Sequence, residues 1–169
     1  MKVFVRSDVG RRPINEDAYY LPKEGESFCA IADGMGGHNA GEIASGLAVE
    51  TYGQSLRDSG KINGAAMRMA VEKANTAVYE ESLRVPRYSG MGTTFTALAQ
   101  SGTDLHIAHV GDSRAYLIRH GAIMRLTIDH TLVEEMVLQG LITPGRPSTT
   151  PGATTSPARW APRSRWRWI

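Results

Sequence analysis

The amino-acid sequence predicts an α+β fold, a layered sandwich in which helices pack against an antiparallel sheet. Short β-rich runs near the N-terminus are followed by two stretches with helical periodicity, and further β-rich runs come after them. Because the helices and the strands occur in separate blocks, the strands are expected to pair in an antiparallel sheet with the helices segregated from it. The 169 residues are enough for one domain with its own core.

Three N-terminal strands are expected, because apolar and β-branched side chains alternate or cluster there between turn residues. Their expected ranges are residues 2–6, 17–21 and 27–32. A turn over residues 22–26 would join the second strand to the third, which would end at Asp33.

Two helices are expected next. Apolar residues recur near helical spacing from Ile43 to Leu56, and Gly60 would end that helix. From residue 65 to about residue 84, apolar side chains keep a spacing of three and four with charged residues elsewhere on the wheel. This pattern is typical of an amphipathic helix.

The β pattern then returns in short runs bounded by glycine-containing turns. The expected strands cover residues 93–99, 105–110, 114–119 and 122–126. The first three would be antiparallel neighbours, and a further helix over residues 132–138 would end at Gly140.

The composition changes abruptly at Pro144. The segment from there onward holds five of the eight prolines, all three tryptophans and five arginines, and it has no Asp or Glu. We therefore expect a domain over residues 1–143 and a basic tail rich in Pro, Arg and Trp over residues 144–169. The tail is either a disordered linker or the product of a frameshift in the coding DNA, and we favour the frameshift.

Composition also limits the function classes. The net charge of +2 and the lack of a run of about 20 apolar residues argue against a nucleic-acid or membrane partner. Binding of nucleic acid or a membrane surface through the Arg- and Trp-rich tail is the weaker alternative. Cys29, the single cysteine, lies in an apolar run without a basic neighbour. We expect a buried, unreactive thiol, no intrachain disulfide and a cytoplasmic protein.

Candidate chemistry is concentrated in three aspartates near the ends of predicted strands. Asp17, Asp33 and Asp112 each adjoin a short apolar run, and hard carboxylate oxygens in such positions suit Mg²⁺ or Mn²⁺. Any one of them alone would more often form a turn or cap a helix. Three in similar settings favour a metal site.

The loop after Asp33 is rich in glycine but does not fit a phosphate-binding loop. It lacks the lysine of a P-loop, and Asn39 stands where a third glycine would be needed. Its glycines would instead let the backbone approach a metal ion, with the Gly34 carbonyl as a ligand. Arg12, five residues before Asp17, would offer a bidentate guanidinium to a phosphoryl group.

Five short motifs, in order along the chain, resemble those of the bacterial 2C-type, or PPM, metal-dependent protein serine/threonine phosphatases. The motifs are Arg12-Pro13-Ile14-Asn15-Glu16-Asp17-Ala18, Ala32-Asp33-Gly34-Met35-Gly36-Gly37-His38, Gly92-Thr93-Thr94, Val110-Gly111-Asp112-Ser113-Arg114 and Asp129-His130-Thr131. Each is weak evidence alone, but the ordered set is specific. The resemblance covers residue 3 to about residue 143.

The resemblance implies a β-sandwich flanked by helices, in the layer order α/β/β/α, of which this chain would hold an incomplete part. It also implies hydrolysis of phosphoserine and phosphothreonine in proteins at a centre of two Mn²⁺ or Mg²⁺ ions, with room for a third, where a metal-activated water attacks phosphorus. The expected partners are phosphoproteins, with a bacterial Ser/Thr kinase and its substrates among them. A monomer is expected.

The roles of the family's residues, carried onto this sequence, give each candidate a place. By this resemblance, Asp33 would bridge two metal ions and Gly34 would contribute its carbonyl. The remaining expected roles are contacts through or beside metal-bound waters for Asp17 and Glu16, a third, weaker metal ion for Asp112, and binding of the substrate phosphate for Arg12.

Two departures from the family pattern lower the expected activity. Met35 stands where many animal and plant members have a histidine that protonates the leaving group; His38 is a substitute by type only, and His130 has no assigned role. The chain also lacks the Ser-Asp-Gly and Asp-Asn segments that complete the family's metal shell, so a truncated, impaired enzyme is expected. The alternative is a non-catalytic phosphoprotein-binding module that keeps Arg12 and one metal ion.

Overall fold

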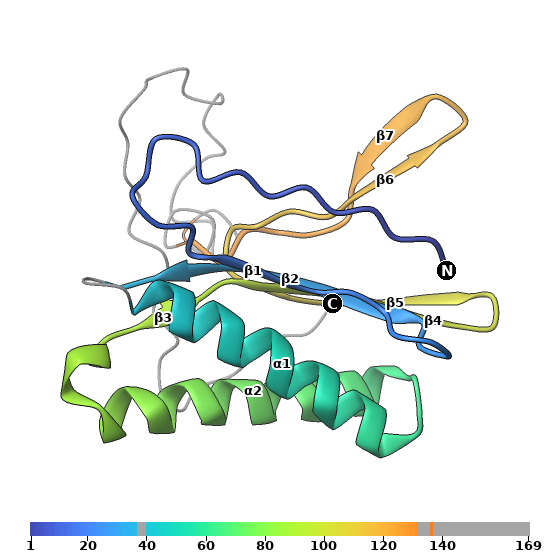
Figure 1. Cartoon of the computed structure of the whole chain (residues 1–169). Coiled ribbons are helices and arrows are strands. Elements are labelled where there is room, and N and C mark those ends of the chain that lie inside the picture. The colour runs from blue at the N-terminus through green and yellow to red at the C-terminus, as the bar shows by residue number, and fades with distance from the viewer. Residues whose placement is uncertain (37–39, 132–135, 137–169) are drawn as a thin grey trace.

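Both helices lie on one side of an antiparallel sheet (Figure 1). The computed structural model describes residues 1–36, 40–131 and 136. The larger sheet has five strands, with β1, β2, β4 and β5 in that order and β3 paired to β2. Its strands are β1 (Asp17–Tyr20), β2 (Phe28–Met35), β3 (Gly92–Thr93), β4 (Phe95–Ser101) and β5 (Asp104–Val110). This arrangement confirms the predicted α+β class.

A second, two-stranded sheet forms a hairpin from β6 (Tyr116–Arg119) and β7 (Ala122–Arg125). The hairpin projects from the side of the larger sheet that is away from the helices, where the N-terminal segment also runs (Figure 1). The described residues therefore place a helix layer on one face of the large sheet and irregular or hairpin structure on the other.

Helix α1 (Gly41–Ser59) is anchored at its C-terminal end. Gly60 has a φ of 61° and donates its N–H to the Arg57 carbonyl, which is a common way to end a helix. The Arg57 side chain donates to Glu26 Oε1 at 2.8 Å and to the Tyr20 hydroxyl. These bonds tie the end of α1 to the turn between β1 and β2.

Helix α2 (Gly64–Arg84) matches the predicted amphipathic helix within one residue. The Asn63 side chain caps its start by accepting the Ala66 N–H at 2.9 Å, and a 3-10 turn, η1 (Pro86–Tyr88), follows its end. Its apolar stripe is buried as expected and consists of Met67, Ala70, Val71, Ala74 and Val78.

Small side chains on the helix-facing side of the sheet allow a close approach of α1. Ala30 pairs with Ala97 across β2 and β4, and antiparallel partners point to the same face. At Gly53 of α1 there is no room for a side chain, because a Cβ would lie 2.1 Å from the Tyr20 ring. The largest fully buried side chains between the layers are Tyr52, Phe95, Leu56 and Met67.

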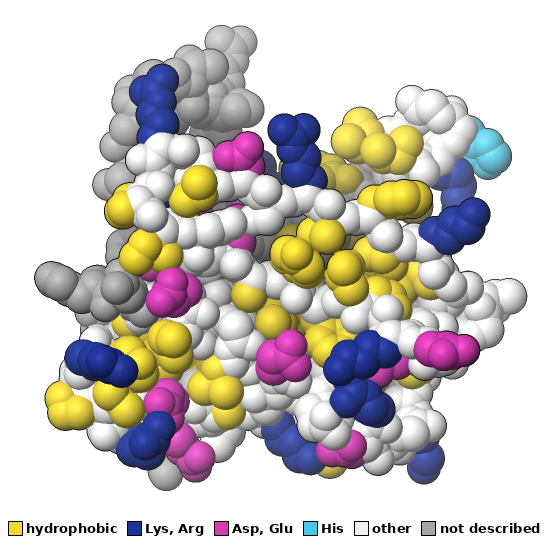
Figure 2. Space-filling model, viewed as in Figure 1, with side chains coloured by type: hydrophobic (Ala, Val, Ile, Leu, Met, Phe, Trp, Pro, Cys, Tyr) yellow, Lys and Arg dark blue, Asp and Glu magenta, His cyan; other side chains and the backbone are white. Residues whose placement is uncertain are grey.

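The opposite face of the sheet is partly apolar. Tyr19 of β1 and Ile31 of β2 are cross-strand partners on this face, and they are 45% and 46% exposed. In Figure 2, hydrophobic side chains (yellow) gather on the surface at the level of the sheet. Asp17 of β1 and Asp33 of β2 form the next cross-strand pair on this same face, two residues further along each strand.

Two of the strand predictions are wrong in the N-terminal part. Residues 2–6 form no strand, and their apolar side chains are not packed into the core, since Phe4 is 91% exposed and Val5 is 39% exposed. Strand β2 runs through Asp33 to Met35 instead of ending at Asp33, since Asp33 still pairs with Asp17 and Met35 with Gly92.

The strand expected over residues 114–119 does not join β5. The chain turns out of the sheet at Gly111, whose φ is 105°, so β6 pairs with β7 within the described part of the chain. The expected helix over residues 132–138, apart from Met136, and the expected tail over residues 144–169 lie outside the described residues. The boundary between domain and tail stays a prediction.

Cys29 is less buried than the sequence suggests. It is partly buried, and burial raises the pKa of its thiol, which disfavours the reactive thiolate. Within the described ranges, no helix has the length and apolar character needed to cross a membrane.

Candidate metal centre

Two of the candidate carboxylates are direct neighbours on the sheet. Asp17 of β1 lies opposite Asp33 of β2 in the antiparallel register. Cross-strand partners point to the same face with Cβ atoms about 5 Å apart. This face is the one away from the helices, so both carboxylates are accessible from solvent.

Besides Asp17, two further carboxylates and one cation affect the pKa of Asp33. Burial is the largest cause that raises the pKa of the Asp33 carboxyl, and the negative charges of Asp17 and Asp112 raise it further. The Arg12 guanidinium lowers this pKa, and the Glu16 carboxylate raises it. The charges of four side chains that the sequence singled out thus act on Asp33, and three of the four are negative.

Glu16 is fixed between β2 and the start of α1. Its carbonyl accepts the Gly34 N–H at 3.0 Å and the Ser45 hydroxyl at 2.6 Å. Its carboxylate accepts the Arg12 guanidinium at 3.2 Å. The N-terminal end of α1 carries partial positive charge, which favours a carboxylate at this position.

Gly34 and Gly41 leave no room for side chains beside Glu16. A Cβ on Gly34 would lie 2.0 Å from the Gly41 carbonyl oxygen, and a Cβ on Gly41 would lie 2.3 Å from Glu16 Oε1. The backbone at Gly34 and Gly41 and the Glu16 carboxylate therefore lie close together at the end of the sheet. Carboxylate and carbonyl oxygens are the ligands that Mg²⁺ and Mn²⁺ prefer, so the donor set fits a divalent cation.

The carboxylates do not form a complete ligand cage by themselves. Across residues 1–36, 40–131 and 136, no three His, Cys, Asp or Glu side chains are grouped closely enough to hold a metal ion alone. Mg²⁺ commonly keeps several waters and is bound through one or two carboxylates. The assignment of individual ligands therefore stays a prediction.

Asp112 lies in a turn that is held by residues from a later segment. The Gly111 carbonyl accepts the His130 N–H at 2.7 Å. Arg114 donates from Nη2 to Asp129 Oδ2 at 2.7 Å and from Nε to both carboxylate oxygens of Asp129 at 3.2 Å. The turn that presents Asp112 is thus fixed to residues 129–130 on both of its sides.

Sequence reasoning missed the residues that hold this turn. Asp129 and His130 carried no expected function of their own, and Thr94 was noted only as part of a motif. Burial lowers the pKa of His130, so the neutral ring is favoured, and nothing in its contacts supports a role as an acid. His38 lies outside the described residues. The places of Asp129, His130 and Thr94 in the ordered motifs were the signal that could have identified them.

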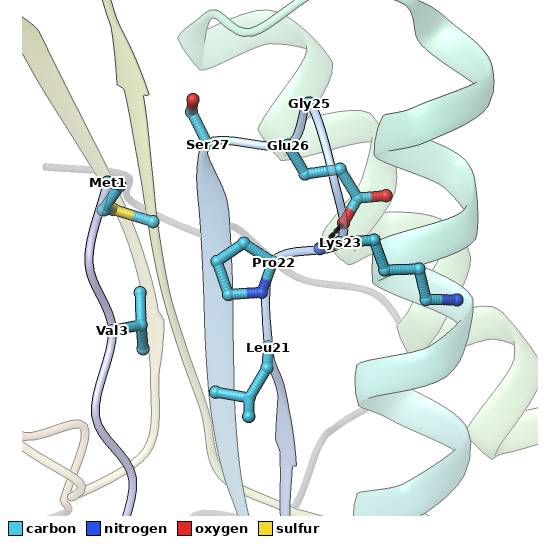
Figure 3. A pocket seen from close by; sticks show the side chains of 8 residues that line it. All are labelled: Met1, Val3, Leu21, Pro22, Lys23, Gly25, Glu26 and Ser27. Atoms are coloured by element: carbon cyan, nitrogen blue, oxygen red, sulfur yellow. Dashed lines mark hydrogen bonds between the residues drawn. The ribbon is translucent and has the colours of Figure 1, made fainter.

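An open pocket of about 500 Å³ lies at the other end of the β1–β2 hairpin (Figure 3). Its lining includes Met1, Val3, Leu21 and Lys23. The one carboxylate in it, Glu26, already accepts bonds from the Lys23 N–H and from groups outside the pocket. The pocket lies at the opposite end of the hairpin from the aspartates, so it is not the candidate site.

The α+β fold and the facing aspartates of β1 and β2 fit the class that the sequence motifs resemble, that of the 2C-type protein phosphatases. The chain belongs to the protein phosphatase 2C family, whose model matches residues 7–136.

Similar proteins come from several bacteria. The serine/threonine protein phosphatase PstP of Mycobacterium tuberculosis is 40% identical over 146 residues, which are 85% of this chain and 28% of PstP. Protein phosphatase PhpP of Streptococcus pneumoniae is 36% identical over 151 residues, which are 85% of this chain and 61% of PhpP. The catalytic domain of PstP in complex with two manganese ions is 40% identical, with a TM-score of 0.67 over 79% of this chain and 57% of that structure. The chain spans less than two thirds of each of these proteins.

Proposed function

We propose that this chain hydrolyses phosphoserine and phosphothreonine esters in proteins, with two Mn²⁺ or Mg²⁺ ions and a third held more weakly. The observation that carries the proposal is the pairing of Asp17 with Asp33 on one face of the sheet, with the turn that carries Asp112 linked to Asp33 through Thr94 and Ser113. The manganese ions in the PstP structure support the choice of metal. Because the chain spans only part of its relatives, the activity is proposed and awaits the test below.

Each candidate residue has a part in this proposal. Asp33 would hold two ions and the Gly34 carbonyl would add an oxygen ligand. The other proposed parts are orientation of water for Asp17 and Glu16 and retention of the third ion for Asp112. The ions, when bound, supply Lewis acidity and a nucleophilic water for attack on phosphorus.

Arg12 is suited to receive the substrate phosphate. Its side chain is 73% exposed and pairs with Glu16 at 3.2 Å. Exposed ion pairs contribute less than about 1 kcal/mol, so the guanidinium can exchange its partner at little cost. A phosphate then gains a fork of parallel N–H donors.

The direct test is hydrolysis of a phosphothreonine peptide by the full chain, with and without Mn²⁺. We expect turnover that requires Mn²⁺ and that falls at least about 100-fold in Asp33→Asn, because the loss of a ligand should exceed the 10- to 100-fold cost of losing a supporting residue. If saturating Mn²⁺ gives no turnover above the metal-free control, the proposed activity is wrong.

A second measurement separates catalysis from binding alone. Arg12→Ala should weaken phosphopeptide binding, whereas Arg11→Ala, a change of the same size in the neighbouring exposed arginine, should not. Phosphate-dependent binding without turnover, lost only in Arg12→Ala, would favour the non-catalytic phosphoprotein-binding module.

The proposed partners follow from the proposed reaction. They are phosphoproteins, including a bacterial Ser/Thr kinase and its substrates. The proposed location is the cytoplasm, and the proposed oligomeric state is a monomer. The serine/threonine phosphatases among the similar proteins support this choice.

A further inference from the structure

We propose that Thr94 is a positioning residue that fixes Asp33 relative to Asp112. This inference rests on the proposed metal centre, because it concerns the spacing of two of its carboxylates. Asp33 lies on β2 and Asp112 follows β5, and β4 lies between these two strands in the sheet. The distance between the two carboxylates is therefore set by what stands between them.

Thr94 occupies a break in the pairing of β2. Residue pairs before and after it, Ile31 with Thr96 and Gly34 with Thr93, keep one continuous register, which puts Thr94 opposite Asp33. The Thr94 N–H donates to the Asp33 carbonyl at 2.9 Å, as in an ordinary ladder. The Asp33 N–H, however, donates to the Thr94 hydroxyl oxygen at 3.0 Å.

The backbone carbonyl of Thr94 is engaged elsewhere. It accepts the Thr93 hydroxyl at 2.9 Å. The side chain of Thr94 has thus taken over the bond to Asp33 that a backbone carbonyl makes in a regular antiparallel pair. Both backbone groups of Asp33 are held by one residue.

The same hydroxyl reaches the turn that carries Asp112. Thr94 Oγ1 lies 2.8 Å from Ser113 Oγ, and since it accepts the Asp33 N–H it can donate its own hydrogen to Ser113. One oxygen atom therefore joins the backbone of Asp33 to the residue after Asp112. Thr94 is only 5% exposed, so water competes little for these bonds.

The rest of the Thr94 side chain packs on the same turn. A Cβ on Gly111 would lie 2.8 Å from both Cβ and Cγ2 of Thr94. Gly111 has a φ of 105°, a conformation that L side chains rarely adopt. The turn therefore packs closely against Thr94. The Thr94 hydroxyl makes hydrogen bonds and its methyl lies against Gly111.

The test is Mn²⁺ binding by the full chain, measured by titration calorimetry on four variants. Thr94→Val keeps the methyl and removes the hydroxyl, and Thr94→Ser does the reverse. We expect Thr94→Val to weaken Mn²⁺ binding at least about tenfold, as is usual for residues that orient metal ligands. Thr94→Ser should stay close to the wild type.

Thr96→Val is the matched control. Thr96 is also a buried threonine, 8% exposed, and its hydroxyl bonds to His109 Nδ1 at 2.9 Å, away from the candidate ligands. Its replacement should cost comparable stability and leave Mn²⁺ binding unchanged. Ser113→Ala cuts the far end of the bridge without altering the sheet, and it should weaken Mn²⁺ binding even if Thr94→Val fails to fold.

Hydrogen exchange of the Asp33 amide gives a readout that does not depend on metal. Exchange should be faster in Thr94→Val than in the wild type or Thr96→Val. If the wild type binds Mn²⁺ and both Thr94→Val and Ser113→Ala bind it equally well, the inference is wrong while the proposed function stands. If the wild type binds no Mn²⁺, the proposed metal centre fails and the inference falls with it.

Discussion

Replacement of Gly34 by alanine should destabilise the fold and disturb the cation site together. The new Cβ would lie 2.0 Å from the Gly41 carbonyl oxygen and 2.7 Å from the Glu16 carbonyl oxygen. Real Cβ contacts stay beyond about 3.0 Å, so the start of α1 must move away from β2 by about 1 Å. The atoms in the way are backbone, which cannot rotate aside as a side chain can.

The magnitude follows from this displacement. Overpacking of this kind costs about 1–3 kcal/mol. For a chain of this size, each kcal/mol lowers the melting temperature by about 2–4 °C, so we expect a loss of about 2–12 °C. A displacement of about 1 Å in a site can cost about 100-fold in function, so Mn²⁺ binding should fall as well.

Gly46→Ala is the matched control, since it makes the same change at a glycine of α1, the helix that Gly34 of β2 approaches. A Cβ there meets no heavy atom within 4 Å. Alanine is favoured over glycine inside a helix by about 0.5–1 kcal/mol, so this variant should melt at a higher temperature. Thermal unfolding by circular dichroism compares the three proteins. A Gly34→Ala protein as stable as the wild type would show that the close approach at Gly34 has been misjudged.

Three further predictions concern the core and the response to acid. Met67→Ala should cost about 2–5 kcal/mol in urea unfolding, because Met67 is 2% exposed, whereas Met69→Ala, at a 59% exposed position of the same helix, should change stability by less than about 0.5 kcal/mol. Tyr52→Phe should be neutral or stabilising in the same assay, because the buried Tyr52 hydroxyl has no hydrogen-bond partner in the described part of the chain, and a loss above about 1 kcal/mol would reveal one. Burial opposes ionisation of Glu26, but bonds from the Lys23 N–H and Arg57 outweigh it and lower the Glu26 pKa below its ordinary 4.5. The stability from Glu26 is therefore present above about pH 4.5 and lost as the pH falls through the lowered pKa, so Glu26→Gln should flatten the fall in melting temperature between about pH 6 and about pH 3.

Periodicity was sufficient for the helices but not for the end of β2. The stripe of apolar residues in α2 specifies both the helix and its buried face. Asp33 and Gly34 looked like the end of a strand, because aspartate and glycine favour turns. In the structure Gly34 is there for the close approach of Gly41, and the pairing of Asp33 with Asp17 overrides the local preference.

The candidate site needed more than local pattern. Asp17 and Asp33 become neighbours only through the register of β1 and β2, which no single segment determines. The separation of the aspartates along the chain did not predict that they share one site. The resemblance to a family did. Apart from its place in an ordered motif, Thr94 could not be singled out, because a threonine in a β-rich run has no local feature that distinguishes a link between β2 and the Asp112 turn from an ordinary strand residue.

Helix α1 also works as a spacer of fixed length along the β1–β2 hairpin. Its first residue, Gly41, lies against the end of β2, and Arg57 near its other end binds Glu26 in the hairpin turn. The 19-residue helix, about 28 Å long, thus contacts the hairpin at both of its ends. A slip of one residue between the strands would point Asp17 or its partner into the helix layer. Substitutions of Arg57, at the far end from the aspartates, should therefore impair cation binding without any contact to the cation.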